Sequence, residues 1–177
     1  MWWTICYPGE ADTVPDAVFA AVRAVVPEAI PVGVRVSGTD WVDDEPSWDI
    51  DQTIPFGHAV KQAGADWIDV SSGGVSPKQK IALAPGYQVP LAEAVKQAVG
   101  LPTMAVGLIT EPAQANAIVA NGQADMVALG RAMRYDPRWA WHAAAELGAT
   151  VEGPPQYWRC LPSGKNAVFG KTNFGAR

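Results

Sequence analysis

The chain has 177 residues, of which 49% are hydrophobic and 18% are charged, and its net charge is −5. This length is enough for one domain with its own core, and the composition is that of a folded globular protein rather than a disordered one. The negative charge argues against nucleic acid as a partner, because binding a phosphate backbone needs a positively charged surface.

The sequence also gives no reason to expect a membrane or a metal. Its most apolar stretch, AVFAAVRAVV, is interrupted by Arg23 and is far too short to span a bilayer. The first residues lack a basic segment and soon reach Pro8, so we expect no signal peptide. Cys6 and Cys160 have no metal or redox spacing, which favours a reducing compartment. We expect a cytoplasmic protein without a metal.

Helix-like and strand-like segments alternate along the chain from Pro15 onward. The predicted helices are 16–26, 49–64, 91–99, 111–121 and 136–146. The predicted strands, each rich in Val, Ile, Leu or Ala, are 31–38, 66–74, 102–109 and 125–130. Asp49 and Thr110 are predicted to cap the second and fourth helices, and Gly100 and Gly122 to end the third and fourth. Pro55 would strain the second helix.

This alternation predicts right-handed βαβ crossovers and a parallel sheet of the α/β class. Four βα units fit either a small doubly wound sheet or half of a TIM (β/α)8 barrel. In PVGVRVSG the valines share one face, while Gly33, Arg35 and Ser37 share the other. A doubly wound sheet needs aliphatic side chains on both faces, so we predict the half-barrel.

The stretch from Ala105 to Arg131 has the pattern of a phosphate site. Two strand-like pieces end at Gly107 and Gly130, and Arg131 follows the second glycine. Glycines at the carboxyl ends of parallel strands let a ligand approach the backbone, and an arginine adds a charge-assisted contact. The alternative is that the glycines simply end the strands and Arg131 is a solvated surface charge.

Arg35 lies inside an apolar strand, where an unpaired charge is costly. It either forms an ion pair with an inward carboxylate such as Asp69, or it faces an anionic ligand at the mouth of the barrel. Both interpretations stay open at this point.

Other polar and aromatic residues give less information. His58 and His142 fall inside predicted helices, away from the strand ends. Trp2, Trp3 and Trp158 lie in the irregular ends of the chain and indicate either a partner surface or core packing. The sequence has no metal-ligand cluster, nucleophile elbow or Rossmann turn.

Five motifs together resemble a known family. In chain order they are VRVSGTDW, WIDVSSGG, PGYQVP, PTMAVGLIT and DMVALGRAMRYDPRW. They resemble the old yellow enzyme family of NADH:flavin oxidoreductases, and most of all its bacterial NADPH dehydrogenase branch, which is similar to xenobiotic and ene reductases. The likeness covers about 14–159 and implies the C-terminal half of an FMN-binding TIM barrel.

The resemblance implies roles for matching residues. Arg35 would contact the pyrimidine side of the flavin, and Ser71 would lie beside it. Gly130 and Arg131 would bind the FMN phosphate, with Gly107 on the neighbouring loop. One further residue, Arg159, resembles a C-terminal arginine that some members extend into a neighbouring subunit's active site. No catalytic residue is identified.

The chain also departs from the family pattern. The family's N-terminal half does not match, and with it the substrate-binding histidine or asparagine pair and the proton-donating tyrosine. Residues 1–13 and the tail after Arg159 do not resemble the family either. We therefore predict an irregular segment 1–13, a partial FMN-binding barrel 14–150 and a tail 151–177, from a truncated or frameshifted gene.

The predicted function is FMN-dependent oxidation of NADPH or NADH, with hydride transfer to an activated alkene such as an enone. The alternative is a non-catalytic half-barrel that binds FMN or another phosphorylated ligand, and a more distant one is a flavin-free phosphate-binding barrel of biosynthetic type. We expect slow turnover by this chain alone. The open strand edges of a half-barrel also predict a homo-oligomer.

Overall fold

A computed structural model describes residues 13–160 and 166–170 of the chain. The chain divides into two units: the first comprises 1–109 and 117–128, and the second comprises 110–116 and 129–177. The predicted segment 1–13, apart from its last residue, lies outside the described residues, as do Trp2, Trp3 and Cys6. The predicted division into 1–13, 14–150 and 151–177 stays a prediction.

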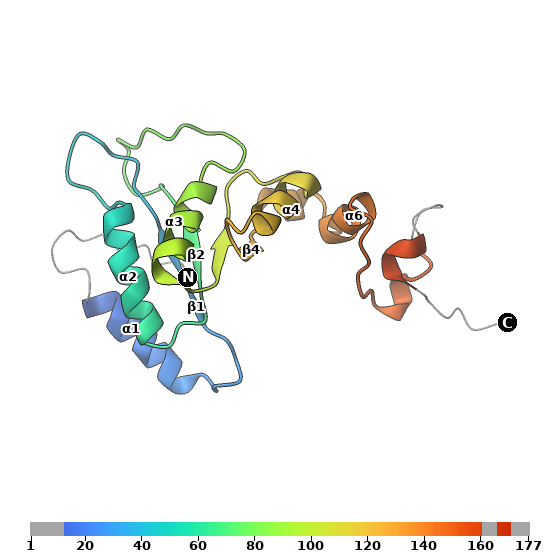
Figure 1. Cartoon of the computed structure of the whole chain (residues 1–177), viewed down its shortest axis with the longest axis horizontal. Coiled ribbons are helices and arrows are strands. Elements are labelled where there is room, and N and C mark those ends of the chain that lie inside the picture. Colours follow the sequence, from blue (N-terminus) through green and yellow to red (C-terminus); the bar gives the residue numbers. More distant parts are fainter. Residues whose placement is uncertain (1–12, 161–165, 171–177) are drawn as a thin grey trace. The chain divides into compact units, whose positions relative to one another are not determined.

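The first unit contains a parallel sheet of four strands in the order β1-β2-β3-β4 (Figure 1). The strands are β1 (Gly33–Ser37), β2 (Trp67–Ser71), β3 (Thr103–Ala105) and β4 (Met126–Val127). Each strand pairs with the next one along the chain. Strands follow one another in this way around a barrel, whereas a doubly wound sheet reverses its order. The predicted α/β class with a parallel sheet is therefore confirmed.

Helices cover one face of this sheet. The first three are α1 (Thr13–Val25), α2 (Ile50–Gln62) and α3 (Val89–Val99). α2 packs against α3, and α3 also contacts β2 and β3. Ile68 and Val70 of β2 lie beneath these helices and have no exposed surface. Gly57 permits the close approach, because a Cβ there would lie 2.8 Å from Val99 and 3.3 Å from Ile68.

The local sequence explains where α2 and α3 begin and end. Asp49 caps α2 by accepting hydrogen bonds from the amides of Asp51 and Gln52, and the Gln52 side chain accepts one from the Asp49 amide in return. α3 ends at Gly100, which has a left-handed φ of 66°. Both predicted helix ends are confirmed. Pro55 is accommodated inside α2 at an exposed position.

Other predicted boundaries were wrong. β3 ends at Ala105 and not at 109, because positive φ angles at Gly107 (122°) and Leu108 (50°) turn the chain away from the strand direction. β4 is likewise only Met126–Val127. The helix predicted after Thr110 is α4 (Pro112–Ala120), so the cap position is 111, since proline favours the first turn of a helix.

The second unit is built from short elements around a small apolar cluster. They are α5 (Arg131–Tyr135), α6 (Trp139–Glu146), η1 (Pro155–Tyr157) and η2 (Asn166–Phe169). Phe169 is buried there, and both Trp141 and Trp158 pack against the cluster. The Trp158 indole also donates to the Gly153 carbonyl at 2.8 Å. Of the two interpretations of Trp158, the structure supports packing. α5 was not predicted, because five residues are too few to show a helical period.

Two further expectations concern the described residues. His58 lies in α2 and His142 in α6, both inside helices as predicted. Among the helices that the structure describes, none is long and apolar enough to cross a membrane.

Candidate functional site

The loops that follow β1 and β2 are joined by backbone hydrogen bonds at the carboxyl edge of the sheet. The amide of Gly38 donates to Ser71 at 2.7 Å, and the amide of Gly73 donates to Thr39 at 2.9 Å. Further out, the amide of Lys80 donates to the Trp41 carbonyl at 2.8 Å. The two loops thus form one structure beyond the strand ends.

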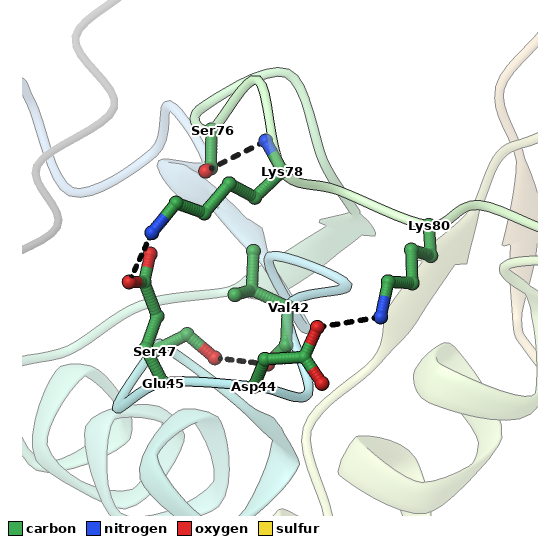
Figure 2. Close-up of polar contacts among 7 residues, drawn as sticks. All are labelled: Val42, Asp44, Glu45, Ser47, Ser76, Lys78 and Lys80. Atoms are coloured by element: carbon green, nitrogen blue, oxygen red, sulfur yellow. Dashed lines mark hydrogen bonds and ion pairs between the residues drawn. The ribbon is translucent and has the colours of Figure 1, made fainter.

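Two ion pairs add to this connection (Figure 2). Lys78 Nζ lies 2.5 Å from Glu45 Oε2, and Lys80 Nζ lies 2.6 Å from Asp44 Oδ2. The four side chains are 43–76% exposed, so solvent weakens both pairs. Two carboxylates of the acidic loop after β1 are therefore paired with lysines of the loop after β2, a pairing that the sequence did not predict.

Arg35 and Asp69 form an ion pair on the sheet face opposite Ile68 and Val70. They are register partners in β1 and β2, and Arg35 Nη1 donates to Asp69 Oδ2 at 2.9 Å. The Asp69 side chain is 13% exposed, and its burial raises the pKa of the carboxyl group against the lowering effect of Arg35. The ion-pair interpretation is confirmed. The Arg35 side chain is still 38% exposed, so the pair leaves part of it accessible to a ligand.

The loop after β3 presents two adjacent amide groups. The carbonyl of Val106 accepts a hydrogen bond from Gln88 Nε2 at 3.0 Å, and the carbonyl of Gly107 accepts one from the amide of Gly86 at 2.9 Å. In a trans peptide the N–H points opposite to the C=O. The amides of Gly107 and Leu108 therefore point away from the segment that holds the carbonyls.

Neither of these two amides donates a hydrogen bond to any residue that the structure describes. Two consecutive amides without an acceptor among the described residues can both donate to one anion, and phosphate oxygens accept such bonds well. The geometry of Gly107 and Leu108 thus fits the phosphate group that the sequence predicted here.

Position 107 requires glycine for two reasons. Its φ of 122° is unfavourable for any residue with a Cβ. A Cβ at this position would also lie 2.8 Å from Gln88 Nε2 and 3.2 Å from the Tyr87 ring. The next residue, Leu108, adopts a φ of 50°, which costs a non-glycine residue about 1–2 kcal/mol. Such strain is concentrated at functional sites in proteins.

The remaining residues that the sequence singled out are distributed over both units. Ser71 ends β2, and its hydroxyl donates to the Val36 carbonyl at 3.4 Å. Gly130 and Arg131 belong to the second unit, at the cap position and the first residue of α5. A Cβ at Gly130 would meet no atom within 4 Å, so a ligand can approach this backbone closely.

Three of the predicted residues lie in the first unit, namely Arg35, Ser71 and Gly107. The other three lie in the second unit, namely Gly130, Arg131 and Arg159. The side chains of Arg131 and Arg159 are exposed. The described residues contain no cluster of three or more potential metal ligands.

Gln88 is only 4% exposed and lies at the cap position of α3, but it was not predicted as a site residue. The helix was predicted to begin at 91, two residues later than it does, so position 88 did not stand out as a cap position. Its partners lie in other loops, so their identity was not readable from the local sequence.

Comparison with known proteins supports the resemblance seen in the motifs. The model of the NADH:flavin oxidoreductase / NADH oxidase family matches residues 14–149. The chain belongs to this family. With this membership and the sequential parallel sheet, the prediction of a partial TIM barrel is also confirmed.

Among its relatives are three bacterial proteins named NADPH dehydrogenase. The protein of Geobacillus thermodenitrificans (strain NG80-2) is 44% identical over 129 residues, and that of Geobacillus sp. (strain WCH70) is 43% identical over 129. The protein of Listeria monocytogenes serotype 4a (strain HCC23) is 42% identical over 132. Each match covers 73% of this chain and 37% of the relative.

One solved structure with a partial likeness is the wild-type GGGPS from Thermoplasma volcanium. The TM-score is 0.44 and the sequence identity is 15%, and the match covers 75% of this chain and 53% of that chain. In the NADPH dehydrogenases named above, the part that matches this chain is little more than a third of their length.

Proposed function

We propose that this chain is the FMN-binding part of a flavin oxidoreductase that oxidises NADPH or NADH. The observation that supports this most directly is the pair of adjacent amides at Gly107 and Leu108, which are oriented away from their own loop and donate to no described residue. Family membership identifies the phosphate-bearing ligand for such a site as a flavin nucleotide.

Within the first unit, the amides of Gly107 and Leu108 would donate to the phosphate oxygens. In the second unit, Arg131 would make a charge-assisted contact with an FMN phosphate, a role that rests on the resemblance alone. Gly130 would let the phosphate approach the backbone, since no atom lies near the position of a Cβ. The bound FMN would supply the hydride-accepting ring, which no amino-acid side chain can provide.

Arg35 would stabilise negative charge that develops on the pyrimidine side of the bound ring. A guanidinium group fixed in place before the reaction does this without reorganisation. Asp69 would hold Arg35 in that orientation through the 2.9 Å hydrogen bond. Ser71, at the end of the neighbouring strand, would lie beside the ring.

The finer assignments rest on the resemblance to the ene-reductase branch. The substrate would be a small activated alkene such as an enone, which accepts the hydride. Arg159, exposed after η1, would reach the substrate or the site of a neighbouring subunit in a homo-oligomer. The cysteine usage suits a location in the cytoplasm.

A second candidate is a protein that binds FMN or another phosphorylated ligand without turnover. The observation in its favour is that the candidate site residues would all bind the ligand, and none of the described residues is assigned a catalytic role. This binding protein would have the same phosphate site and the same Arg35 as the oxidoreductase, and it would differ only in not transferring hydride.

Two measurements on the full chain separate these candidates. The visible spectrum of the protein mixed with FMN and then freed of unbound ligand tests flavin binding. NADPH consumption with cyclohexenone, at saturating FMN and against free FMN alone, tests turnover. A retained flavin spectrum with a rate above the free-flavin background supports the oxidoreductase. A retained flavin with only the background rate supports the binding protein, and the absence of retained flavin contradicts both FMN assignments.

A further inference from the structure

Gln88 connects two loops at the carboxyl edge of the sheet. It lies directly before α3, but its side chain makes no capping hydrogen bond to that helix. Instead Gln88 Oε1 accepts from the hydroxyl of Ser72 at 2.6 Å, and Nε2 donates to the Val106 carbonyl at 3.0 Å. The first partner follows β2 and the second follows β3. A single buried side chain thus spans the two loops.

The connection extends to the loop after β1 and has a fixed direction. Trp41 Nε1, which can only donate, lies 2.7 Å from the hydroxyl oxygen of Ser72. At the other end the Val106 carbonyl can only accept. The Ser72 hydroxyl must therefore give its hydrogen to Gln88, and the Gln88 amide has only one orientation that satisfies both neighbours. The chain of hydrogen bonds runs from Trp41 through Ser72 and Gln88 to Val106.

We propose that Gln88 is a positioning residue, which fixes the Val106–Leu108 backbone so that the amides of Gly107 and Leu108 face a phosphate group. This inference rests on the proposed function for the identity of the ligand. The two described non-glycine residues with positive φ are Trp41 (59°) and Leu108 (50°), and they lie at or near the two ends of the hydrogen-bond chain. Strained conformations of this kind persist only where neighbouring groups hold them.

Other contacts at this edge cannot replace Gln88. The ion pairs Lys78–Glu45 and Lys80–Asp44 are exposed, and they join only the loops after β1 and β2. The backbone bond from Gly86 to Gly107 does reach the loop after β3, and it would remain after a change of the Gln88 side chain. Loss of the side chain should therefore loosen the Val106–Leu108 loop without releasing it.

The test compares Gln88→Met with Gln123→Met in the full chain. Methionine has a similar length but cannot form these hydrogen bonds. Gln123 is the control, because it is a half-buried glutamine of the same unit and its Nε2 also donates a hydrogen bond, to Glu93 at 3.1 Å. It precedes β4 and therefore lies at the amino ends of the strands, away from the loop after β3. Three quantities are measured. The first is hydrogen exchange of the Gly86 amide in the unliganded protein, which reports on the loop because this amide donates to the Gly107 carbonyl. The others are the dissociation constant of FMN and that of riboflavin, which lacks the phosphate.

We expect the Gly86 amide to exchange faster in Gln88→Met than in the wild type, with exchange in α2 unchanged. We expect this variant to weaken FMN binding by about tenfold, the effect of losing the hydrogen bond to the Val106 carbonyl, and to leave riboflavin binding unchanged. Gln123→Met should resemble the wild type in all three quantities. Exchange of the Gly86 amide at the wild-type rate, or equal weakening of FMN and riboflavin binding, would overturn the positioning role.

Two further outcomes are also decisive. If the wild type binds neither flavin, the proposed function fails, and faster exchange of the Gly86 amide in Gln88→Met still supports the control of this loop by Gln88. If Gln88→Met does not fold, Ser72→Ala removes the middle link while keeping the Val106 bond. A smaller increase in exchange of the Gly86 amide then supports the inference, and no increase overturns it.

Discussion

Arg35 on β1 and Asp69 on β2 are register partners whose side chains meet at 2.9 Å on the face of the sheet opposite the helices. The arginine is the more exposed of the two, at 38% against 13% for the carboxylate. The buried partner therefore orients the accessible one, which is the arrangement expected if the guanidinium serves a ligand.

Replacing Asp69 by Asn should change how stability depends on pH. Burial raises the pKa of Asp69 above 3.8, so the folded protein binds this proton more tightly than the unfolded chain. The stabilising contribution of Asp69 is complete below pH 3.8 and is lost as the pH rises through the pKa that Asp69 has in the folded protein. Denaturant unfolding of both proteins from acid to neutral pH should show the wild type losing stability relative to Asp69→Asn as the pH rises. A constant difference would contradict the assigned burial.

Asp125 should show the opposite dependence. Its carboxylate accepts hydrogen bonds from Lys96 and from the Thr103 amide, both at 2.9 Å, and these lower its pKa below 3.8. The stabilising contribution of Asp125 is present above pH 3.8 and is lost as the pH falls through the pKa that Asp125 has in the folded protein. In the same experiment, the advantage of the wild type over Asp125→Asn should shrink in acid. An advantage that grew in acid would show that these contacts do not hold in solution.

The two carboxylates illustrate what sequence reasoning could and could not reach. The ion pair of Asp69 was one of two open interpretations, because alternation along a strand places Arg35 and Asp69 on corresponding faces. The ends of α2 and α3 were predictable because their caps are local, at Asp49 and Gly100. Local sequence did not reveal the end of β3, because the backbone at Leu108 is held by distant contacts.

The same limit applies to the candidate site. Gly107, Gly130 and Arg131 were found because glycine and arginine follow strand-like runs. Gln88 was missed, since its role depends on partners 16 and 18 residues away that only the fold brings near. A site residue whose side chain contacts several loops at once cannot be predicted from the local sequence around it.

Gly107→Ala should destabilise the first unit more than Gly122→Ala does. Both glycines have positive φ, 122° and 75° respectively, but a Cβ at Gly107 would lie 2.8 Å from Gln88, whereas at Gly122 it would meet nothing within 4 Å. Gly122→Ala should lose about 1–2 kcal/mol of unfolding free energy from conformation alone. Gly107→Ala should lose at least 1 kcal/mol more, roughly the cost of overpacking. Equal losses in denaturant titrations would show that the close approach to Gln88 is absent.

The ion pairs in Figure 2 should contribute little to stability. Lys78 and Lys80 are 64% and 59% exposed, and exposed pairs contribute about 0–1 kcal/mol each. The double variant Lys78→Ala/Lys80→Ala should therefore unfold within about 2 kcal/mol of the wild type. Exchange of its Gly86 amide should be unchanged, because neither pair contacts Gly86 or the loop after β3. Faster exchange of this amide would assign the loop to the ion pairs instead of to Gln88.

The central claim is that this chain binds FMN through its phosphate, and a parallel titration with FMN and riboflavin tests it most directly. Fluorescence quenching should show tighter binding of FMN by the wild type. Arg131→Ala should weaken FMN by about 1.5–3 kcal/mol, the usual contribution of a hydrogen bond to a charged group, and leave riboflavin unchanged. Arg134→Ala, an exposed arginine of the same helix, is the control and should bind both like the wild type. Equal affinity of the wild type for FMN and riboflavin, or no binding of either, would contradict the account.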